Sequence, residues 1–114
     1  MLPRENRITD KKDFDEVRNK GRLVQSDSFA FGFIDNNAGT PSRFSFIVST
    51  KISKKATLRN RVKRAMREGV RQNLTYIKKG IDGVFLAKTS ILNKPTPEIM
   101  KEVGEIIVSS KINA

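Results

Sequence analysis

The chain has 114 residues, of which 23 are Lys or Arg and 12 are Asp or Glu, for a net charge of +11. This length suits one domain with a modest core, and the excess of positive charge favours a polyanionic partner. Cys and His are both absent, which excludes disulfides, thiolate or His-based zinc sites and nucleophilic triads. Nothing in the composition contradicts a reducing cytoplasm, the predicted location.

A membrane and a small-molecule substrate are not expected partners. No apolar run in the sequence is long enough to span a bilayer, and no signal-peptide pattern is recognised at its start. Nucleic acid is therefore the favoured polyanion.

Residues 1–9, MLPRENRIT, predict an extended arm in which Arg4 and Arg7 are candidate phosphate contacts. The next segment predicts a short helix that Thr9 or Asp10 can cap and that runs to the residue before Gly21. Its good core residues are few, Phe14 and Val17. The helix must therefore pack against another element of the fold to be stable.

Strict alternation predicts a strand over Ser28–Asp35, with three phenylalanines on one side: Phe29, Phe31 and Phe33. These rings are either a stacking platform for bases or the buried face of a sheet, and burial is favoured because a small domain must bury its large aromatics. The turn-forming segment Asn36–Ser42 leads to a second strand, Arg43–Thr50. We expect these two strands to pair as an antiparallel hairpin.

The segment Lys51–Arg71 contains nine basic residues and one acidic residue. As a helix from about Thr57, it places one set of residues on a docking face: Leu58, Val62, Ala65, Met66 and Gly69, with Val70 at the margin. A stripe on the opposite face, here called the cationic rail, comprises Asn60, Arg64, Arg67 and Arg71, flanked by Arg59, Arg61 and Lys63. A solvated helix face normally pairs Glu with Lys or Arg four residues apart, and this one has almost nothing to pair with. Cations near a helix N-terminus are also unfavourable, so the rail and the helix start favour binding of an external phosphate.

The last third of the chain predicts one strand and one helix. Asp82–Lys88 contains a continuous apolar run, which suits a strand covered on both faces. Thr96 is expected to cap the final helix, with Pro97 at its first position. The predicted buried stripe of this helix is Ile99, Met100, Val103, Ile106 and Ile107.

The elements together indicate an α+β fold, a two-layer α/β sandwich of one domain spanning residues 1–114. Their order is helix, strand, strand, basic helix, strand, helix, with a further short strand near Arg22–Gln25 left open. One face of the sheet is expected to bury the phenylalanines under helices. The other face is a candidate open groove built from small residues: Ala30, Gly32, Ser45 and Ser49.

The run Ala56–Glu68, centred on Arg59-Asn60-Arg61, resembles the RNR signature of the protein subunit of bacterial ribonuclease P. Thirteen residues agree in charge and apolar spacing. Other segments agree in order, namely Pro3–Ile8 with the family's arm, Asp13-Phe14 and Lys20-Gly21 with its first helix, and Arg43–Lys51 and Val84–Lys88 with the strands around the signature. The resemblance covers nearly the whole chain.

The resemblance implies a function. In this family the enzyme removes the 5′ leader of precursor tRNA, and its RNA subunit carries the Mg²⁺-dependent catalysis. We therefore expect an accessory protein that binds the catalytic RNA and the leader, has no catalytic residue and holds no metal stably itself. The resemblance also implies that the basic helix forms a left-handed crossover between parallel strands, against the usual right-handed preference.

The expected RNA-binding residues follow from the family's use of the basic helix. The residues that match the family's signature by position are expected to contact the catalytic RNA: Arg59, Asn60, Arg61, Lys63, Arg64 and Arg67. Four neighbouring basic residues are added because of their charge: Lys51, Lys54, Lys55 and Arg71. The expected leader-binding residues are Phe14, Arg18, Gly32 and Lys88. Arg18 and Gly32 stand where the family usually has aromatics, so a wider groove that holds the leader more by charge than by stacking is expected.

Two other functions are weighed against this one. A structural RNA-binding protein, such as a small ribosomal protein, has the same basic α+β character. A stand-alone nuclease would need a metal held by acids such as Asp10, Asp13 and Asp15, but these fit helix capping and solubility better.

Overall fold

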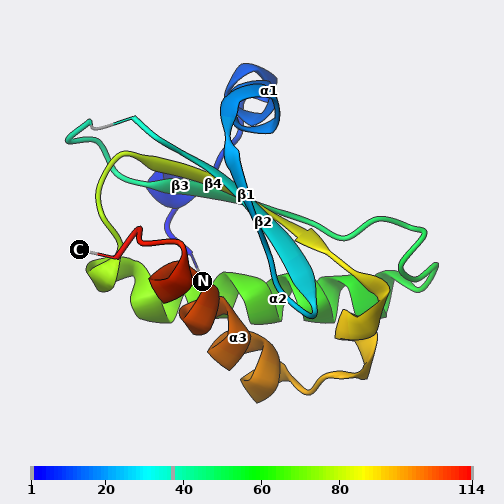
Figure 1. Cartoon of the computed structure of the whole chain (residues 1–114). Coiled ribbons are helices and arrows are strands. Elements are labelled where there is room, and N and C mark those ends of the chain that lie inside the picture. The colour runs from blue at the N-terminus through cyan, green and yellow to red at the C-terminus, as the bar shows by residue number, and fades with distance from the viewer. Residues whose placement is uncertain (1, 37, 114) are drawn as a thin grey trace.

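The structure, a computed structural model, describes residues 2–36 and 38–113 (Figure 1). Residue 1 of the predicted arm, residue 37 of the predicted turn and residue 114 lie outside this description. Within it the helices are α1 (Lys11–Lys20), α2 (Ala56–Asn73) and α3 (Thr96–Ser109). The strands are β1 (Arg22–Gln25), β2 (Phe29–Asp35), β3 (Arg43–Ile47) and β4 (Ile81–Ala87), and short 3₁₀ turns are η1 (Arg4–Asn6), η2 (Leu74–Tyr76) and η3 (Thr89–Asn93).

The four strands form one mixed sheet in the order β1-β2-β4-β3. The predicted hairpin of β2 with β3 is wrong, because β4 lies between them and pairs antiparallel with β2 and parallel with β3. The connection from β2 to β3 is too long to force a tight hairpin, and β4, whose first five residues are buried, lies between the two strands. The open prediction of a short strand at β1 is confirmed by its antiparallel pairing with β2.

The parallel pairing of β3 with β4 confirms that α2 lies in a crossover between parallel strands. The left hand of this crossover stays a prediction. The β3 strand ends at Ile47, three residues before the predicted Thr50, and the chain then runs through a loop to the start of α2.

The phenylalanines of β2 are core residues. Phe29 and Phe31 are fully buried and Phe33 is 4% exposed, which confirms packing over base stacking. The Phe31 and Phe85 rings stack with their centroids 4.5 Å apart. Gly83 is needed beside them, because a Cβ there would lie 2.6 Å from the Phe31 ring.

Helices cover the two faces of the sheet unequally (Figure 1). Both α2 and α3 lie on one side, and α1 crosses the opposite side. The predicted docking face of α2 is buried at Val62, Ala65, Met66, Gly69 and Val70. A Cβ at Gly69 would stand 2.9 Å from Val103 Cβ, so glycine permits the close approach of α2 to α3.

The helix ends agree with the prediction at α1 and disagree at α3. The Asp10 side chain accepts a hydrogen bond from the Lys12 N–H at 3.0 Å, and Gly21 follows the last residue of α1. Thr96 is not the cap of α3 but its first residue, because Pro95 precedes the helix and its carbonyl accepts from Glu98 N at 3.0 Å.

A polar cluster attaches α3 to the turn between β1 and β2. The carboxylate of Glu102 accepts hydrogen bonds from Ser26 Oγ, from Ser28 N at 2.8 Å and from Lys94 Nζ at 3.0 Å. Burial alone raises the pKa of Glu102, but these hydrogen bonds outweigh it and lower the value to about 2. The turn that leads into β2 is thereby fixed to α3.

Candidate nucleic-acid interface

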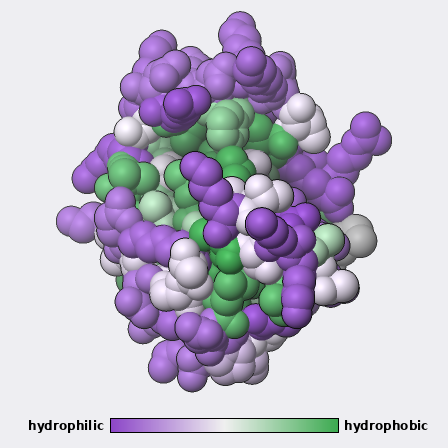
Figure 2. Space-filling view, turned by 90° about the vertical axis from the view of Figure 1, so that its right-hand side faces the viewer, coloured by the Kyte–Doolittle hydropathy of each residue, from purple (hydrophilic) through white to green (hydrophobic). Residues whose placement is uncertain are grey.

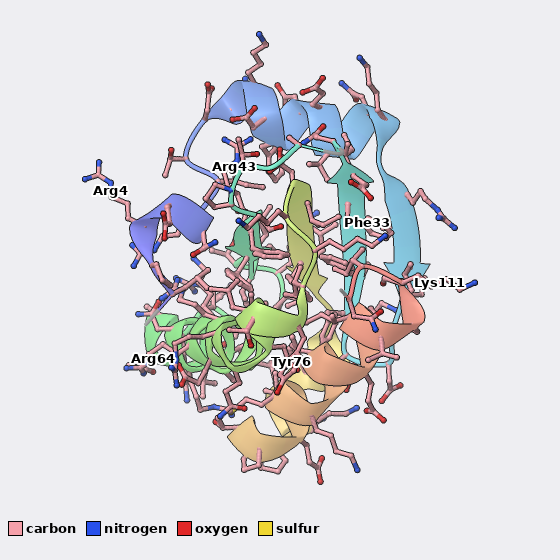
Figure 3. All side chains as sticks on the ribbon, turned by 90° about the vertical axis from the view of Figure 1, so that its left-hand side faces the viewer. Arg4, Phe33, Arg43, Arg64, Tyr76 and Lys111 are labelled. Carbon is pink, nitrogen blue, oxygen red and sulfur yellow. The ribbon has the colours of Figure 1, made fainter. Side chains whose placement is uncertain are left out.

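The cationic rail lies on the side of α2 away from its docking face. Asn60 and Arg64 are exposed, and Arg64 projects outward from the helix (Figure 3). A shallow hollow of about 260 Å³ is lined by Asn60, Lys63, Arg64 and Arg67. Four residues of the predicted RNA-binding set therefore lie together on one accessible surface.

The N-terminus of α2 adds positive potential to this surface. No acidic residue occupies its first turn, and Lys55 at the cap position makes no side-chain capping hydrogen bond. The side chains of the preceding loop that belong to the predicted set are exposed: Lys51, Lys54 and Lys55. Backbone N–H groups and lysines thus face the same solvent region, an arrangement that attracts phosphate.

Two arginines of the signature also bind the protein's own backbone. Arg59 Nη1 donates to Ser53 O at 2.7 Å. Arg61 donates through Nη1 to Lys94 O and through Nη2 to Leu92 O, both at 3.2 Å. Arg61 therefore fixes the segment between β4 and α3, a role that the sequence did not indicate. Since guanidinium has five N–H donors, both side chains keep donors for RNA.

The C-terminal part of the rail is partly neutralised. Arg71 Nε donates to Glu68 at 2.8 Å, and this contact raises the pKa of Arg71 and lowers the pKa of Glu68. The Arg67 guanidinium lies 5.9 Å from the centre of the Phe46 ring. The strongest uncompensated charge is therefore at the N-terminal half of α2.

A second surface lies between α1 and the exposed face of the sheet. It is a cavity of about 390 Å³ lined by Phe14, Val17, Arg18, Gly21, Arg22, Leu23, Gly32, Val84 and Leu86. Figure 2 looks onto this side of the molecule, where hydrophobic residues gather below the hydrophilic ones of the α1 region. The cavity is mainly apolar, with arginines at its edge.

Three of the four predicted leader-binding residues meet in this cavity: Phe14, Arg18 and Gly32. Lys88 does not line it, because its Nζ donates to Ser26 O at 2.7 Å. The predicted groove of Ala30, Gly32, Ser45 and Ser49 is also displaced. Only Gly32 of these four lines the cavity, since α1 and β1 move the concave surface toward the β1 edge of the sheet.

The sequence did not identify the aliphatic floor of the cavity. Leu23 is 59% exposed and Leu86 is 39% exposed, so the prediction that the β4 strand is covered on both faces is wrong at Leu86. Leu23 lies directly across from Gly32 in the β1–β2 pairing. The signal that could have found it is an isolated leucine in a short strand beside a glycine, which is weak without the register.

The arm is more ordered than the prediction of an extended segment, since it includes the 3₁₀ turn η1. Leu2 is fully buried, and Ile8 N donates to Phe44 O at 3.0 Å. Arg7 donates to Leu2 O through Nε at 3.0 Å and Nη2 at 2.7 Å, so it stabilises the arm. Arg4 is exposed and projects away from the protein (Figure 3).

The acids weighed for a nuclease have other partners or lie apart. Asp10 caps α1, and Asp13 forms an ion pair with Arg43 at 2.8 Å. Within residues 2–36 and 38–113, no three His, Cys, Asp or Glu side chains gather into a group that could hold a metal ion. Among the same residues, no helix is long and apolar enough to cross a membrane.

Comparison with known proteins gives consistent matches. The family model described as Ribonuclease P matches residues 2–110. A ribonuclease P protein component from Pseudanabaena sp. (strain PCC 6903) is 31% identical over 113 residues, covering 98% of this chain and 97% of the relative. One from Symbiobacterium thermophilum is 33% identical over 100 residues, covering 88% of this chain and 86% of the relative.

Solved structures are similar over most of their length. The RNase P protein of Staphylococcus aureus superposes with a TM-score of 0.86 at 26% identity, covering 96% of this chain and 98% of that one. The RNase P protein of Thermotoga maritima, solved with 1-(4-fluorophenyl)-2-thiourea, gives a TM-score of 0.79 at 27% identity, with coverage of 89% and 96%.

Proposed function

The chain belongs to the ribonuclease P protein family, and on that premise we propose that it binds two RNA molecules through two different surfaces. Its family supplies the accessory subunit of ribonuclease P, the endoribonuclease that processes tRNA 5′ ends. The matches do not favour the alternative of a ribosomal protein. The chain acts in the cytoplasm, where the α2 surface binds the catalytic RNA and the α1 cavity binds the 5′ leader.

The exposed signature on α2 is the observation that carries this proposal. Asn60, Lys63, Arg64 and Arg67 form one accessible surface with the uncapped N-terminus of the helix. Each phosphate that such a surface neutralises releases counterions and strengthens binding at low salt. This surface is shallow, accessible and charged, so it suits the phosphate backbone of a folded RNA.

The cavity under α1 supports binding of a single strand. Phe14 can stack on an unpaired base, and the leucines provide an apolar floor. Arg18 and Arg22 at the edge can bind the leader's phosphates. Substrate recognition is thereby separated from the attachment to the catalytic RNA.

Mg²⁺ in this proposal belongs to the RNA subunit. The chain offers no His or Cys, and its paired acids serve helix capping and ion pairing. The protein supplies cations and positioning around the RNA, and the RNA subunit supplies the metal-dependent cleavage.

A reconstituted cleavage assay tests this function. The protein is mixed with a bacterial ribonuclease P RNA and a precursor tRNA at low Mg²⁺, and cleavage at the mature 5′ end is measured. We expect stimulation only when the RNA subunit is present. Cleavage by protein alone would indicate a nuclease, and no stimulation would favour another ribonucleoprotein.

A further inference from the structure

The α1 helix is held against the sheet by few apolar contacts. It has ten residues, of which only Val17 is buried. Helices this short are marginal in water unless tertiary contacts hold them. A further contact is therefore needed to hold α1 in place, and with it the α1 wall, the side of the cavity that Phe14, Val17 and Arg18 line.

A charged network provides this contact from the other edge of the sheet. Arg43 on β3 donates through Nε and Nη2 to the two carboxylate oxygens of Asp82, at 3.0 and 2.8 Å. Asp82 lies directly across the β3–β4 pair and is 6% exposed. Arg43 Nη1 donates to Asp13 Oδ2 on α1 at 2.8 Å, and Figure 3 shows Arg43 between α1 and the sheet.

The geometry makes Arg43 a rigid bridge. A bidentate contact with a buried carboxylate fixes the plane of the guanidinium. The hydrogen bond to Asp82 raises the pKa of Arg43 against the opposing effect of burial, and the bond to Asp13 raises it further. The Nη1 amino group is thereby held in one direction, toward Asp13 on α1.

Fixing Asp13 also fixes the cavity-lining residues of α1. Phe14 follows Asp13 directly and Arg18 lies five positions later on the same helix. Because a helix turns by about 100° per residue, an anchor at one residue sets the direction of every other side chain. Phe14 and Arg18 both line the cavity.

We propose that Asp13 is a positioning residue. Held by Arg43 and Asp82, it fixes the position of the α1 residues that line the cavity and thereby determines the affinity of the cavity for the leader. Asp13 does not itself touch the leader. This inference rests on the proposed function, because it assumes that the cavity binds the leader.

The test compares two substrates on the assembled holoenzyme. Affinity is measured for a precursor tRNA with its leader and for the same tRNA without one. The affinity with the leader divided by the affinity without it, here called the leader-dependent ratio, reports the leader's contribution. Asp13→Ala removes the anchor, whereas Asp13→Asn keeps an acceptor oxygen for Arg43 Nη1. Asp15→Ala is the matched control, because it removes the same charge from the same helix, and Asp15 forms no ion pair with any residue that the structure describes.

We expect Asp13→Ala to reduce the ratio by about fivefold to tenfold, and Asp13→Asn and Asp15→Ala to leave it within about twofold of the unsubstituted protein. Removing a negative charge by itself strengthens binding to a polyanion, so a fall has the opposite sign to the electrostatic effect. An equal ratio for Asp13→Ala and Asp15→Ala overturns the inference, as does an equal loss for both substrates. A ratio of one in the unsubstituted protein instead refutes leader binding by the cavity.

Discussion

The two proposed RNA-binding surfaces, the α2 surface and the α1 cavity, differ in kind. The α2 helix is anchored by five buried residues, from Val62 to Val70, and its outward face is basic. The α1 helix has one buried residue, and the surface beneath it is concave and mainly apolar. Charge on a firmly packed helix suits strong attachment to any RNA backbone. An apolar wall held by few contacts suits selectivity, because a few substitutions can reshape it.

The largest effect is expected from reversing the charge of the cationic rail, which tests whether α2 and the α1 cavity bind different RNA molecules. Arg64→Glu with Arg67→Glu is expected to weaken binding of the catalytic RNA by at least about a hundredfold and to reduce the salt-dependence slope by about two. The leader-dependent ratio should not change. The measurement is a binding titration at several salt concentrations.

The matched control for the rail is Lys101→Glu with Lys111→Glu, which changes the net charge equally at exposed positions of the C-terminal region. If both double variants lose the same affinity, the rail is not a specific surface and only net charge matters. A melting curve checks that loss of the Arg67–Phe46 contact has not unfolded the domain.

A smaller effect is expected in the cavity. Phe14→Ala should weaken binding of leader-bearing precursor by about tenfold, within the range for loss of one base–aromatic stack, and leave leaderless tRNA unaffected. Tyr76→Ala is the control, since Tyr76 is 66% exposed and lines neither surface. Equal losses for both substrates would show that Phe14 supports the fold and not the leader.

Adding an aromatic side chain at Gly32 should strengthen leader binding by the α1 cavity without changing the α2 surface. A Cβ at Gly32 has its nearest neighbours at 3.8 Å, so a side chain can enter the cavity without backbone strain. Gly32→Tyr is expected to tighten leader binding by about fivefold through stacking. Gly39→Tyr, where a Cβ meets nothing within 4 Å, is the control, and an unchanged or weaker leader affinity counts against the open cavity as the leader site.

The smallest effect on RNA binding is expected from Glu102. Its folded-state pKa of about 2 lies below the ordinary value of 4.5, so its ionised form stabilises the fold. This contribution, on the order of 2 kcal/mol, is complete above about pH 5 and is lost as the pH falls toward 2. Glu102→Gln should lower the free energy of unfolding at pH 7 and flatten its acid dependence, as urea titrations at several pH values measure. Altered RNA affinity at neutral pH would mean that the cluster reaches one of the RNA surfaces.

The sequence by itself determined the local elements and the rail. The two faces of α2 and the alternation of β2 follow from periodicities of about 3.6 and 2 residues, which are properties of neighbouring positions. The signature around Asn60 is likewise contiguous, and this is why the family and the RNA-binding surface could be predicted. The burial of Phe29 and Phe31 followed because a small domain has few other residues to form its core.

Only the tertiary structure decided the strand order and the composition of the cavity. The placement of β4 between β2 and β3 depends on competition among strands distant in the chain, which no local pattern records. Leu23 and Leu86 become the cavity floor because the strand register sets Leu23 across from Gly32 and Leu86 across from Ala30, on the side of the sheet that α1 covers. The Arg43–Asp13 contact joins residues 30 positions apart, so the wall of the cavity follows from the folded geometry, whereas the charge of the rail follows from composition.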